Sequence, residues 1–258
     1  MSRITDIFKG GHKALAAYIT AGYPDIKTTP VIAQTLAGSG ADIIELGIPF
    51  SDPLADGATI QKASYLALQK GTTPEMCLEA AAGIRRVIKT PLVFMTYYNP
   101  VLNYGLEEFC RSCAASGING LIVPDLPPEE GAELETTARK YDLDMIYMLA
   151  PTSTEERIRE AGKRSGGFTY LVSLTGVTGA REELPPELEG FIKRVKKYTS
   201  QALCVGFGIS SAAQAKRVAK VADGVIVGSR LIQLIEADST LGSLKKFTVD
   251  LRRALDSA

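Results

Sequence analysis

Three carboxylic acids lie within twelve positions in the segment Glu45-Leu-Gly-Ile-Pro-Phe-Ser-Asp-Pro-Leu-Ala-Asp-Gly57. Glu45 ends the apolar run Ala41-Asp42-Ile43-Ile44, which is typical of a buried parallel strand. A carboxylate in such a place is costly unless it is paired or protonated. Two prolines and two glycines stiffen the segment, and it carries Asp52 and Asp56. Acids held by a stiff loop at the carboxyl end of a strand suit general acid–base chemistry.

Each acid also has an ordinary structural explanation. Glu45 could pair with a lysine or cap a loop, because structural ion pairs also perturb acids. Asp56 precedes Gly57 and could belong to a plain turn. Asp125 stands before Leu-Pro-Pro, where a catalytic acid could lie, but we interpret it as support for its loop.

The elements that must position these acids repeat eight times as a short apolar run followed by a helical pattern. Eight such βα units predict a (β/α)8 TIM barrel that forms one α/β domain over residues 1–258. An open doubly wound sheet is the alternative, but no GxGxxG motif follows the first run. The predicted strands are Ala14–Thr20, Asp42–Gly47, Leu92–Tyr97, Gly120–Asp125, Met145–Ala150, Phe168–Ser173, Ala202–Gly208 and Gly224–Gly228.

Three short helices are additional to this repeat. One, which contains Ile4, Ile7 and Phe8, is expected to close the barrel floor, and the others cover Ile60–Gln69 and Leu231–Ala237. Two loops that follow strands are long, residues 48–58 and 174–187, and long loops in compact domains are commonly functional. Both should emerge at the catalytic end of the barrel.

Glycines gather after the last three predicted strands, in Gly176-Val-Thr-Gly179, Gly206-Phe-Gly208-Ile-Ser210 and Gly228-Ser229. Glycine lets backbone N–H groups approach an anion, and a helix that starts near Ser229 would point its positive end at the same place. Any one of these loops could be glycine-rich only because turns need positive φ. Together, on neighbouring strands, they predict a phosphate site. A capping box of Ser211 and Gln214 predicts a helix start there.

The composition excludes several classes of protein. Acidic and basic residues balance at 29 each, so no charge excess indicates nucleic acid or a membrane surface as a partner. No apolar run reaches 18 residues and the start lacks a signal-peptide core, so a cytoplasmic protein is expected. Cys110 and Cys113 lie within a helical pattern, and His12 is the only histidine, so we expect packing residues and no metal site.

Several segments together resemble the tryptophan synthase α-subunit family over essentially the whole chain. Residues 45–57 are similar to its signature segment. The other matching segments, in order, are Tyr18-Ile-Thr-Ala-Gly-Tyr-Pro-Asp25, Val123-Pro-Asp-Leu-Pro127, Gly176-Val-Thr-Gly179 and Gly206-Phe-Gly-Ile-Ser210. We find no departure at a position expected to be catalytic.

The resemblance implies a lyase of tryptophan biosynthesis. It would split indole-3-glycerol phosphate into indole and glyceraldehyde 3-phosphate by a retro-aldol reaction. The resemblance also implies an α2β2 complex, in which indole passes through a tunnel to a β subunit. No cofactor is expected in this chain, because pyridoxal phosphate belongs to that partner.

Roles for single residues also follow from the resemblance. Glu45 would be the general acid and base, with a pKa raised by burial, and Asp56 would accept the indole N–H. Tyr18 would line the indole pocket, and the Tyr170 hydroxyl would lie near Glu45, although a tyrosine on an apolar strand is more often a core residue. Thr178 would touch Asp56 when its loop closes. The residues expected to hold the phosphate are Gly179, Gly208, Gly228 and Ser229.

Three rival functions remain open at this stage. Another phosphate-binding barrel enzyme would lack the 45–57 segment, and the indole-glycerol phosphate synthase that acts upstream would need a lysine on a strand, where none occurs. A catalytically weak barrel could serve only to activate a β subunit. A free-standing lyase that releases indole would carry the same catalytic residues.

Overall fold

The computed structural model describes residues 3–172, 187–206 and 208–258, and its strands form one sheet in which every pairing is parallel. The strands are β1 (Ala14–Thr20), β2 (Ile43–Gly47), β3 (Leu92–Met95), β4 (Gly120–Ile122), β5 (Asp144–Ile146), β6 (Met148–Leu149), β7 (Phe168–Val172), β8 (Ala202–Gly206) and β9 (Gly224–Val227). Their order is β5-β4-β3-β2-β1-β9-β8-β7-β6. Because β5 and β6 are consecutive in the chain, this order closes a barrel, and the predicted TIM barrel is confirmed.

The fifth predicted strand, Met145–Ala150, is therefore two short strands that break at Tyr147. The N–H of Tyr170 donates to the carbonyl of Tyr147 over 3.0 Å, which links β7 to the break. Most other predicted strands also extend one to three residues beyond the observed carboxyl ends. The apolar pattern continues past the last ladder hydrogen bond, so the sequence does not mark where a strand leaves the sheet.

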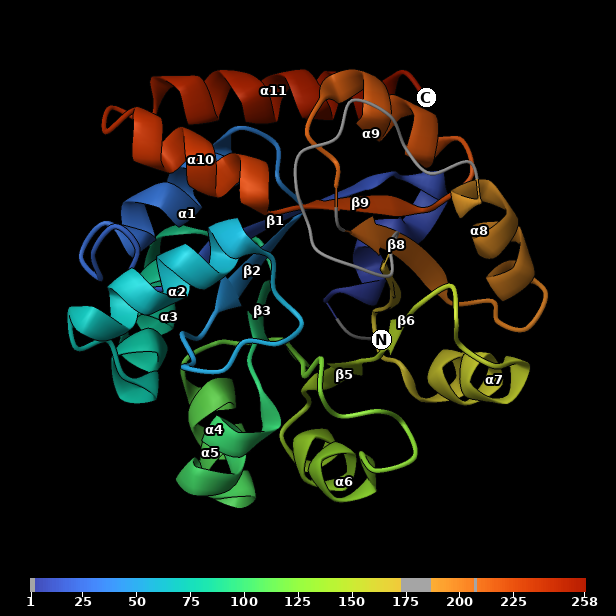
Figure 1. Ribbon diagram of the computed structural model, residues 1–258, viewed down its shortest axis with the longest axis horizontal. Helices are drawn as coiled ribbons and strands as arrows, with labels where there is room; N and C mark the ends of the chain where they lie inside the picture. The colour runs from blue at the N-terminus through green and yellow to red at the C-terminus, as the bar shows by residue number, and fades with distance from the viewer. Residues whose placement is uncertain (1–2, 173–186, 207) are drawn as a thin grey trace.

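Helices surround the barrel on its outer side (Figure 1). They are α1 (Thr29–Gly38), α2 (Ala58–Gln69), α3 (Pro74–Val87), α4 (Tyr98–Tyr104), α5 (Leu106–Ala115), α6 (Ala132–Lys140), α7 (Glu155–Arg164), α8 (Leu188–Lys196), α9 (Ala212–Ala219), α10 (Ser229–Ala237) and α11 (Gly242–Asp256). The 3-10 helix η1 (Thr5–Gly11) lies instead at the barrel floor. The three predicted additional helices are confirmed as η1, α2 and α10. The sequence analysis missed α4, which directly follows the loop after β3.

Local sequence explains where several helices start. Thr73 accepts a hydrogen bond from the N–H of Met76, and Pro74 takes the first helical position of α3. Ser211 accepts from the N–H of Gln214 over 3.3 Å, so the predicted start of α9 is confirmed. The Gln214 side chain returns to the N–H of Ser210 rather than to that of Ser211.

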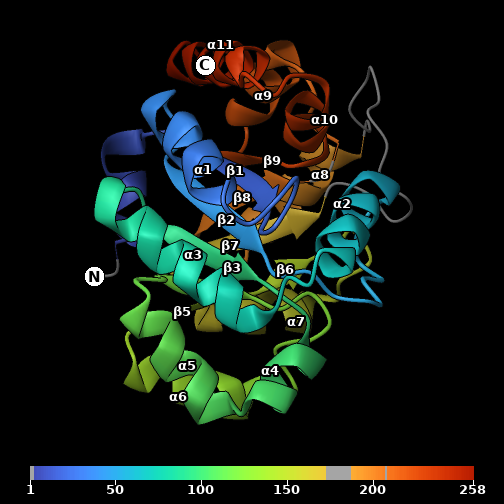
Figure 2. The same ribbon diagram turned by 90° about the vertical axis from the view of Figure 1, so that its left-hand side faces the viewer.

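Two apolar clusters form the core, one between strands and helices and one inside the barrel. Ile4 belongs to the interior cluster, and the rings of Phe8 and Phe168 lie 6.1 Å apart, so the N-terminal segment closes the floor as predicted. In Figure 2 this segment lies at the left end of the barrel and α2 at the right. The loop after Glu45 therefore lies at the end opposite the floor.

The cysteines contribute to this packing. Cys110 and Cys113 are fully buried in α5 and carry free thiols, so their prediction as packing residues is confirmed. Among the described residues, no group of three or more His, Cys, Asp or Glu side chains could hold a metal ion. No described helix is both long and apolar enough to cross a membrane.

Candidate active site

Glu45 lies in the middle of β2 and its side chain points into the barrel. Side chains alternate along a strand, and here Ile43 belongs to the interior cluster while Ile44 and Leu46 face the helices. Glu45 pairs in register with Tyr18 of β1. Its side chain has no solvent exposure, and neither carboxylate oxygen has a hydrogen-bond partner among the described residues. Burial alone raises the pKa of Glu45 to about 8, the direction that the sequence predicts.

Two tyrosines lie beside this carboxyl group, and each leans over a glycine of the next strand. A Cβ atom built on Gly47 would lie 2.1 Å from the Tyr18 hydroxyl, and one built on Gly206 would lie 2.2 Å from the Tyr170 hydroxyl. Burial raises the pKa of both tyrosines, and the charges of Glu45 and Asp56 raise it further. The two predicted acids and the two predicted tyrosines therefore lie within one cluster at the barrel mouth.

Asp56 lies just before α2, whose N-cap is Gly57. The N–H of Asp56 donates to the carbonyl of Pro53, so the residue does belong to a turn, as its position before Gly57 allowed. Its side chain makes a further contact outside that turn. Its Oδ2 atom accepts a hydrogen bond from the Tyr97 hydroxyl over 3.1 Å, while Oδ1 is buried without a partner among the described residues. Burial raises the pKa of Asp56 to about 6, against the lowering effect of the bond from Tyr97.

Tyr97 is a residue of this site that the sequence analysis did not single out. It follows β3, and its hydroxyl also accepts the N–H of Ala55 over 3.0 Å. The available signal was its position at the carboxyl end of a predicted strand, next to the loop that carries Asp56. Asp125, interpreted as loop support, accepts the N–H of Tyr98 at 2.9 and 3.2 Å and so fixes the start of α4.

The predicted phosphate residues that are described lie at the ends of β8 and β9. Gly208 has φ +96°, a conformation that favours glycine. Gly228 is the N-cap of α10 and packs under Tyr18, because a Cβ there would lie 3.3 Å from the Tyr18 Cδ1 atom. Ser229 is the first residue of α10, so its backbone lies at the positive end of that helix. Thr178 and Gly179 lie outside the described residues, as does most of the predicted long loop 174–187.

A cavity of about 610 Å³ opens at this end of the barrel. Asp56 and Gly57 line it from the loop after β2, Val123 and Pro127 from the loop after β4, and Val172 from the end of β7. Arg157 of α7 is a charged group in its wall. The cavity thus collects the carboxyl ends of strands from several parts of the chain, which is where TIM barrels place their chemistry.

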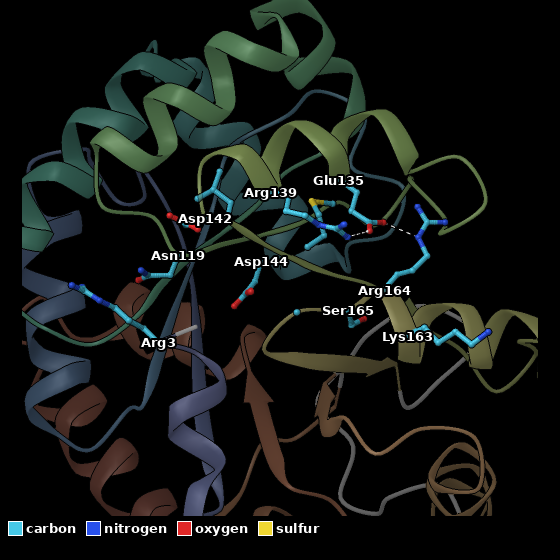
Figure 3. Close-up of a pocket in the computed structure, with 12 residues that line it drawn as sticks. Arg3, Asn119, Glu135, Arg139, Asp142, Asp144, Lys163, Arg164 and Ser165 are labelled. Atoms are coloured by element: carbon cyan, nitrogen blue, oxygen red, sulfur yellow. Dashed lines mark hydrogen bonds and ion pairs between the residues drawn. The ribbon is translucent and has the colours of Figure 1, made fainter. Parts of the chain in front are cut away.

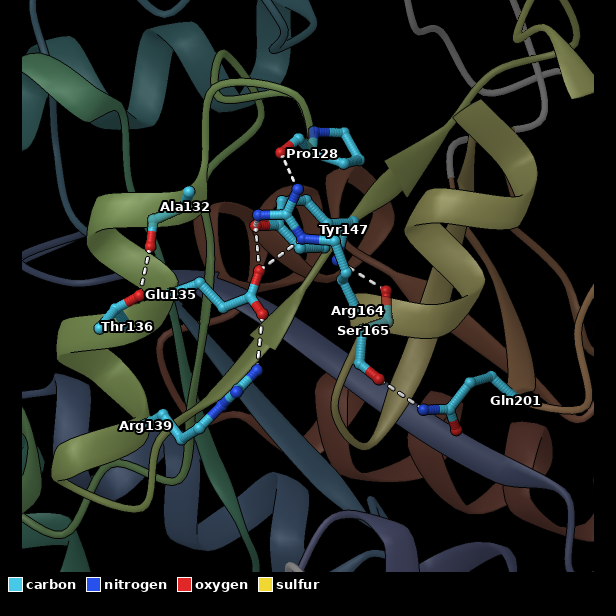
Figure 4. A network of polar contacts seen from close by, with 9 residues as sticks. All are labelled: Pro128, Ala132, Glu135, Thr136, Arg139, Tyr147, Arg164, Ser165 and Gln201. Atoms are coloured by element: carbon cyan, nitrogen blue, oxygen red, sulfur yellow. Dashed lines mark hydrogen bonds and ion pairs between the residues drawn. The ribbon is translucent and has the colours of Figure 1, made fainter. Parts of the chain in front are cut away.

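A second cavity, of about 720 Å³, opens at the amino ends of the strands (Figure 3). Glu135 bonds there to Arg139 and to Arg164, each at 2.7 Å, and accepts the Tyr147 hydroxyl at 3.1 Å (Figure 4). These paired charges tie α6 to α7. The position and the pairing indicate a structural network rather than a catalytic site.

Known proteins of one family are similar to this protein over nearly its whole chain. The sequence profile of the family described as tryptophan synthase alpha chain matches residues 5–256. The tryptophan synthase alpha chain of Dehalococcoides mccartyi is 55% identical, with 99% of this chain and all of that protein covered. The fold is similar to a Mycobacterium tuberculosis tryptophan synthase structure, with a TM-score of 0.92, 39% identity and 98% of both chains covered. Tryptophan synthase subunit alpha of Legionella pneumophila gives a TM-score of 0.91 at 36% identity, with both chains covered completely.

Proposed function

This chain belongs to the tryptophan synthase alpha chain family, and from that premise we propose that Glu45 and Asp56 perform its carbon–carbon lyase reaction. The reaction of this family splits indole-3-glycerol phosphate into indole and glyceraldehyde 3-phosphate in tryptophan biosynthesis. The roles of the two acids come from the family resemblance, and the burial and hydrogen bonding of the site support them. We also propose that residues 1–258 act as one barrel domain, because a single sheet takes strands from the whole described chain.

One observation carries the assignment: two buried acids whose pKa values are separated by their surroundings. Burial raises the pKa of Glu45 to about 8 and that of Asp56 to about 6. Between these values Glu45 is protonated while Asp56 is ionised. Two acids held in opposite states at neutral pH can take opposite roles in one reaction.

The proton steps follow from these states. Protonated Glu45 donates its proton to indole C3, which places positive charge on the ring nitrogen. Ionised Asp56 accepts the indole N–H through Oδ1 and stabilises that charge. The Glu45 carboxylate then removes the proton of the neighbouring glycerol hydroxyl. The C–C bond breaks, its electron pair returns to the indole ring, and the aldehyde forms, which leaves Glu45 protonated for the next turnover.

The rest of the site would hold the two ends of the substrate. Tyr18 would line the indole pocket and the Tyr170 hydroxyl would lie near Glu45, and Gly47 and Gly206 leave room for the two tyrosine rings. Gly208, Gly228 and Ser229 would bind the phosphate through backbone N–H groups and the start of α10. Thr178 and Gly179 are carried over from the family motif alone, with no support from the described residues.

A β subunit is the proposed partner, in an α2β2 complex in which that partner holds pyridoxal phosphate and receives indole. Exposed apolar residues support a docking surface at the mouth of the barrel. Leu54 is 93% exposed in the loop after β2, Tyr65 is 60% exposed on α2, and Leu102 is 51% exposed on α4. Such residues at one end of a barrel favour contact with another protein. The four free thiols suit the cytoplasm, which is the proposed location.

The test is indole release from indole-3-glycerol phosphate with a β subunit present. The wild-type chain should release indole. Glu45→Gln removes the general acid–base group and Asp56→Asn removes the charge that stabilises the protonated indole, so each should lose at least about a hundredfold in kcat/KM. Glu79→Gln, which changes an exposed glutamate of α3, is the control and should match wild type. If Glu45→Gln folds and still turns over at the wild-type rate, the proposed role of Glu45 is wrong. If the wild-type chain only activates the β subunit, the chain is a binding partner.

A further inference from the structure

We infer that Tyr97 is a positioning residue of the lyase site, because its hydroxyl holds the Asp56 carboxylate in the orientation that the indole N–H requires. The inference rests on the proposed role of Asp56. Tyr97 would not touch the reacting atoms, and it would act on the reaction only through Asp56.

The Tyr97 hydroxyl connects the end of β3 to two consecutive residues of the neighbouring loop. It donates to Asp56 Oδ2 over 3.1 Å and accepts the Ala55 N–H over 3.0 Å. A hydroxyl that accepts one hydrogen bond becomes a stronger donor in the next. The backbone of the loop therefore strengthens the bond to the carboxylate that the same loop carries.

This bond uses one carboxylate oxygen and leaves the other for substrate. Oδ1 of Asp56 is buried and has no partner among the described residues. A carboxylate held at one oxygen keeps a fixed rotation about its own Cβ–Cγ bond, so Oδ1 points in one direction. Because a buried acceptor without a partner is costly, the arrangement is explained best by a donor that the substrate supplies.

Tyr97 is itself held from both sides. Its ring is 4% exposed and stacks on Phe50, with ring centroids 5.3 Å apart and planes 29° apart. The next residue, Tyr98, donates its N–H to Asp125 in the loop after β4. The chain of contacts thus runs from β4 through the end of β3 to the loop after β2, and it fixes Asp56 relative to the sheet.

The ionisable groups around Asp56 come from several elements. Beyond the effect of burial, the charge of Asp56 raises the pKa of Tyr18 on β1 and of Tyr170 on β7. Burial raises the pKa of Tyr97, and the charge of Asp125 raises it further. Arg157 of α7 lines the same cavity as Asp56. Among the described residues, only Tyr97 donates a hydrogen bond to the Asp56 carboxylate. Loss of that donor would leave the pKa of Asp56 subject to burial alone, and so higher.

Tyr97→Phe tests the inference, because it removes the hydroxyl and keeps the ring on Phe50. The matched control is Tyr147→Phe. The Tyr147 hydroxyl also donates to a carboxylate over 3.1 Å, that of Glu135, and its ring is 2% exposed, but it lies in the α6–α7 network (Figure 4). The measurement is kcat/KM for indole release against pH, made in the wild-type and the Asp56→Asn backgrounds in the presence of the β subunit.

We expect Tyr97→Phe to lower kcat/KM about tenfold near pH 6.5, as loss of a hydrogen bond to a charged group does, and to move the acid limb to higher pH. Tyr147→Phe should leave that limb in place. In the Asp56→Asn background Tyr97→Phe should have little further effect. A loss that is equal at all pH values, or that persists in that background, would show a structural role and overturn the inference.

The failure of the proposed function gives a different pattern. If Asp56→Asn alone retains wild-type kcat/KM, the proposed role of Asp56 is wrong and the inference falls with it. If Asp56→Asn loses activity while Tyr97→Phe behaves like Tyr147→Phe, the role of Asp56 stands and the inference alone is overturned.

Discussion

The ring of Tyr170 lies over Gly206, so that a Cβ atom on this glycine would come within 2.2 Å of the tyrosine hydroxyl. In register, Gly206 pairs with Val172, two residues beyond Tyr170 on β7. The ring therefore leans across to the neighbouring strand and toward the mouth of the barrel. Tyr18 stands in the same relation to Gly47 on β1 and β2. Small residues at the strand ends thus decide where both hydroxyl groups point.

Gly206→Ala should therefore displace Tyr170 and lower activity as well as stability. A side chain forced into a packed core costs about 1–3 kcal/mol of unfolding free energy. Gly83→Ala is the control, because nothing lies within 4 Å of a Cβ there and Gly83 is in the interior of α3. That change should stabilise by about 0.5–1 kcal/mol, which is the usual advantage of alanine over glycine in a helix. Urea unfolding and indole release on both variants would check this, and equal stability of the two would contradict it.

The dependence of activity on pH should be bell-shaped. Asp56 must be ionised, which sets an acid limb in kcat/KM near its pKa of about 6, and Glu45 must be protonated, which sets a basic limb near its pKa of about 8. Activity should be highest between these values. The check is kcat/KM for indole release across pH 5 to 9. A single limb near pH 4, where exposed carboxyls titrate, would mean that burial does not perturb these acids.

The unpaired carboxyl of Glu45 should also cost stability, and the cost should depend on pH. Its folded-state pKa of about 8 lies above the ordinary value of 4.5, so the folded chain holds a proton that the unfolded chain has lost between these pH values. Stability from this group therefore falls as pH rises through that window. Glu45→Gln lacks the effect, so its stability relative to wild type should rise by roughly 1.4 kcal/mol per pH unit from about pH 5 and level off above pH 8.

Chemical unfolding of both proteins at several pH values measures this difference. Glu79→Gln, an exposed change on α3, should show no such slope. A difference between Glu45→Gln and wild type that stays constant from pH 5 to pH 8 would show that Glu45 is not buried unpaired in solution.

The barrel fold could be predicted from the sequence because the short apolar runs of the strands and the helical spacing of apolar residues between them are both strong in this chain. Each strand is a short run with few charges, and the acid in the interior of the second predicted strand, Glu45, is visible without a structure. Alternation along β2 places Glu45 on the same face as Ile43, but both faces of a parallel strand are buried, so only the structure shows that this face is the barrel interior. The protonation state of Glu45 then follows from burial.

Tyr97 could not be found in this way. Its partners, Ala55 and Asp56, lie more than forty positions earlier in the chain, and the contact depends on how the loop after β2 folds back onto the end of β3. The same holds for the break at Tyr147, which lies where the sheet closes into a barrel between β5 and β6. Hydrophobic pattern records local geometry, whereas these features depend on tertiary arrangement.

The thiols should be inert in the folded protein. Cys77, Cys110, Cys113 and Cys204 are all fully buried, and burial raises the pKa of each, to about 12 for Cys77 and about 11 for Cys110. A thiol that is neither ionised nor accessible is a poor nucleophile. A thiol-reactive dye should label none of the four in native buffer and all four in denaturant. Rapid labelling of the native protein would show that α5 or the barrel interior opens readily.

Docking of the β subunit at the barrel mouth predicts that exposed apolar residues there contribute to the complex. Leu102 is 51% exposed on α4, beyond the carboxyl end of β3, whereas Val87 is 55% exposed at the end of α3 that leads into the amino end of β3. Leu102→Ser should therefore weaken β-subunit binding by about tenfold, as loss of a buried aliphatic contact does, and Val87→Ser should not. Titration of each variant with β subunit, followed by calorimetry, measures the affinities. Equal affinities for Leu102→Ser and the wild type would show that α4 lies outside the interface, and weakening by Val87→Ser alone would place the partner at the opposite end of the barrel.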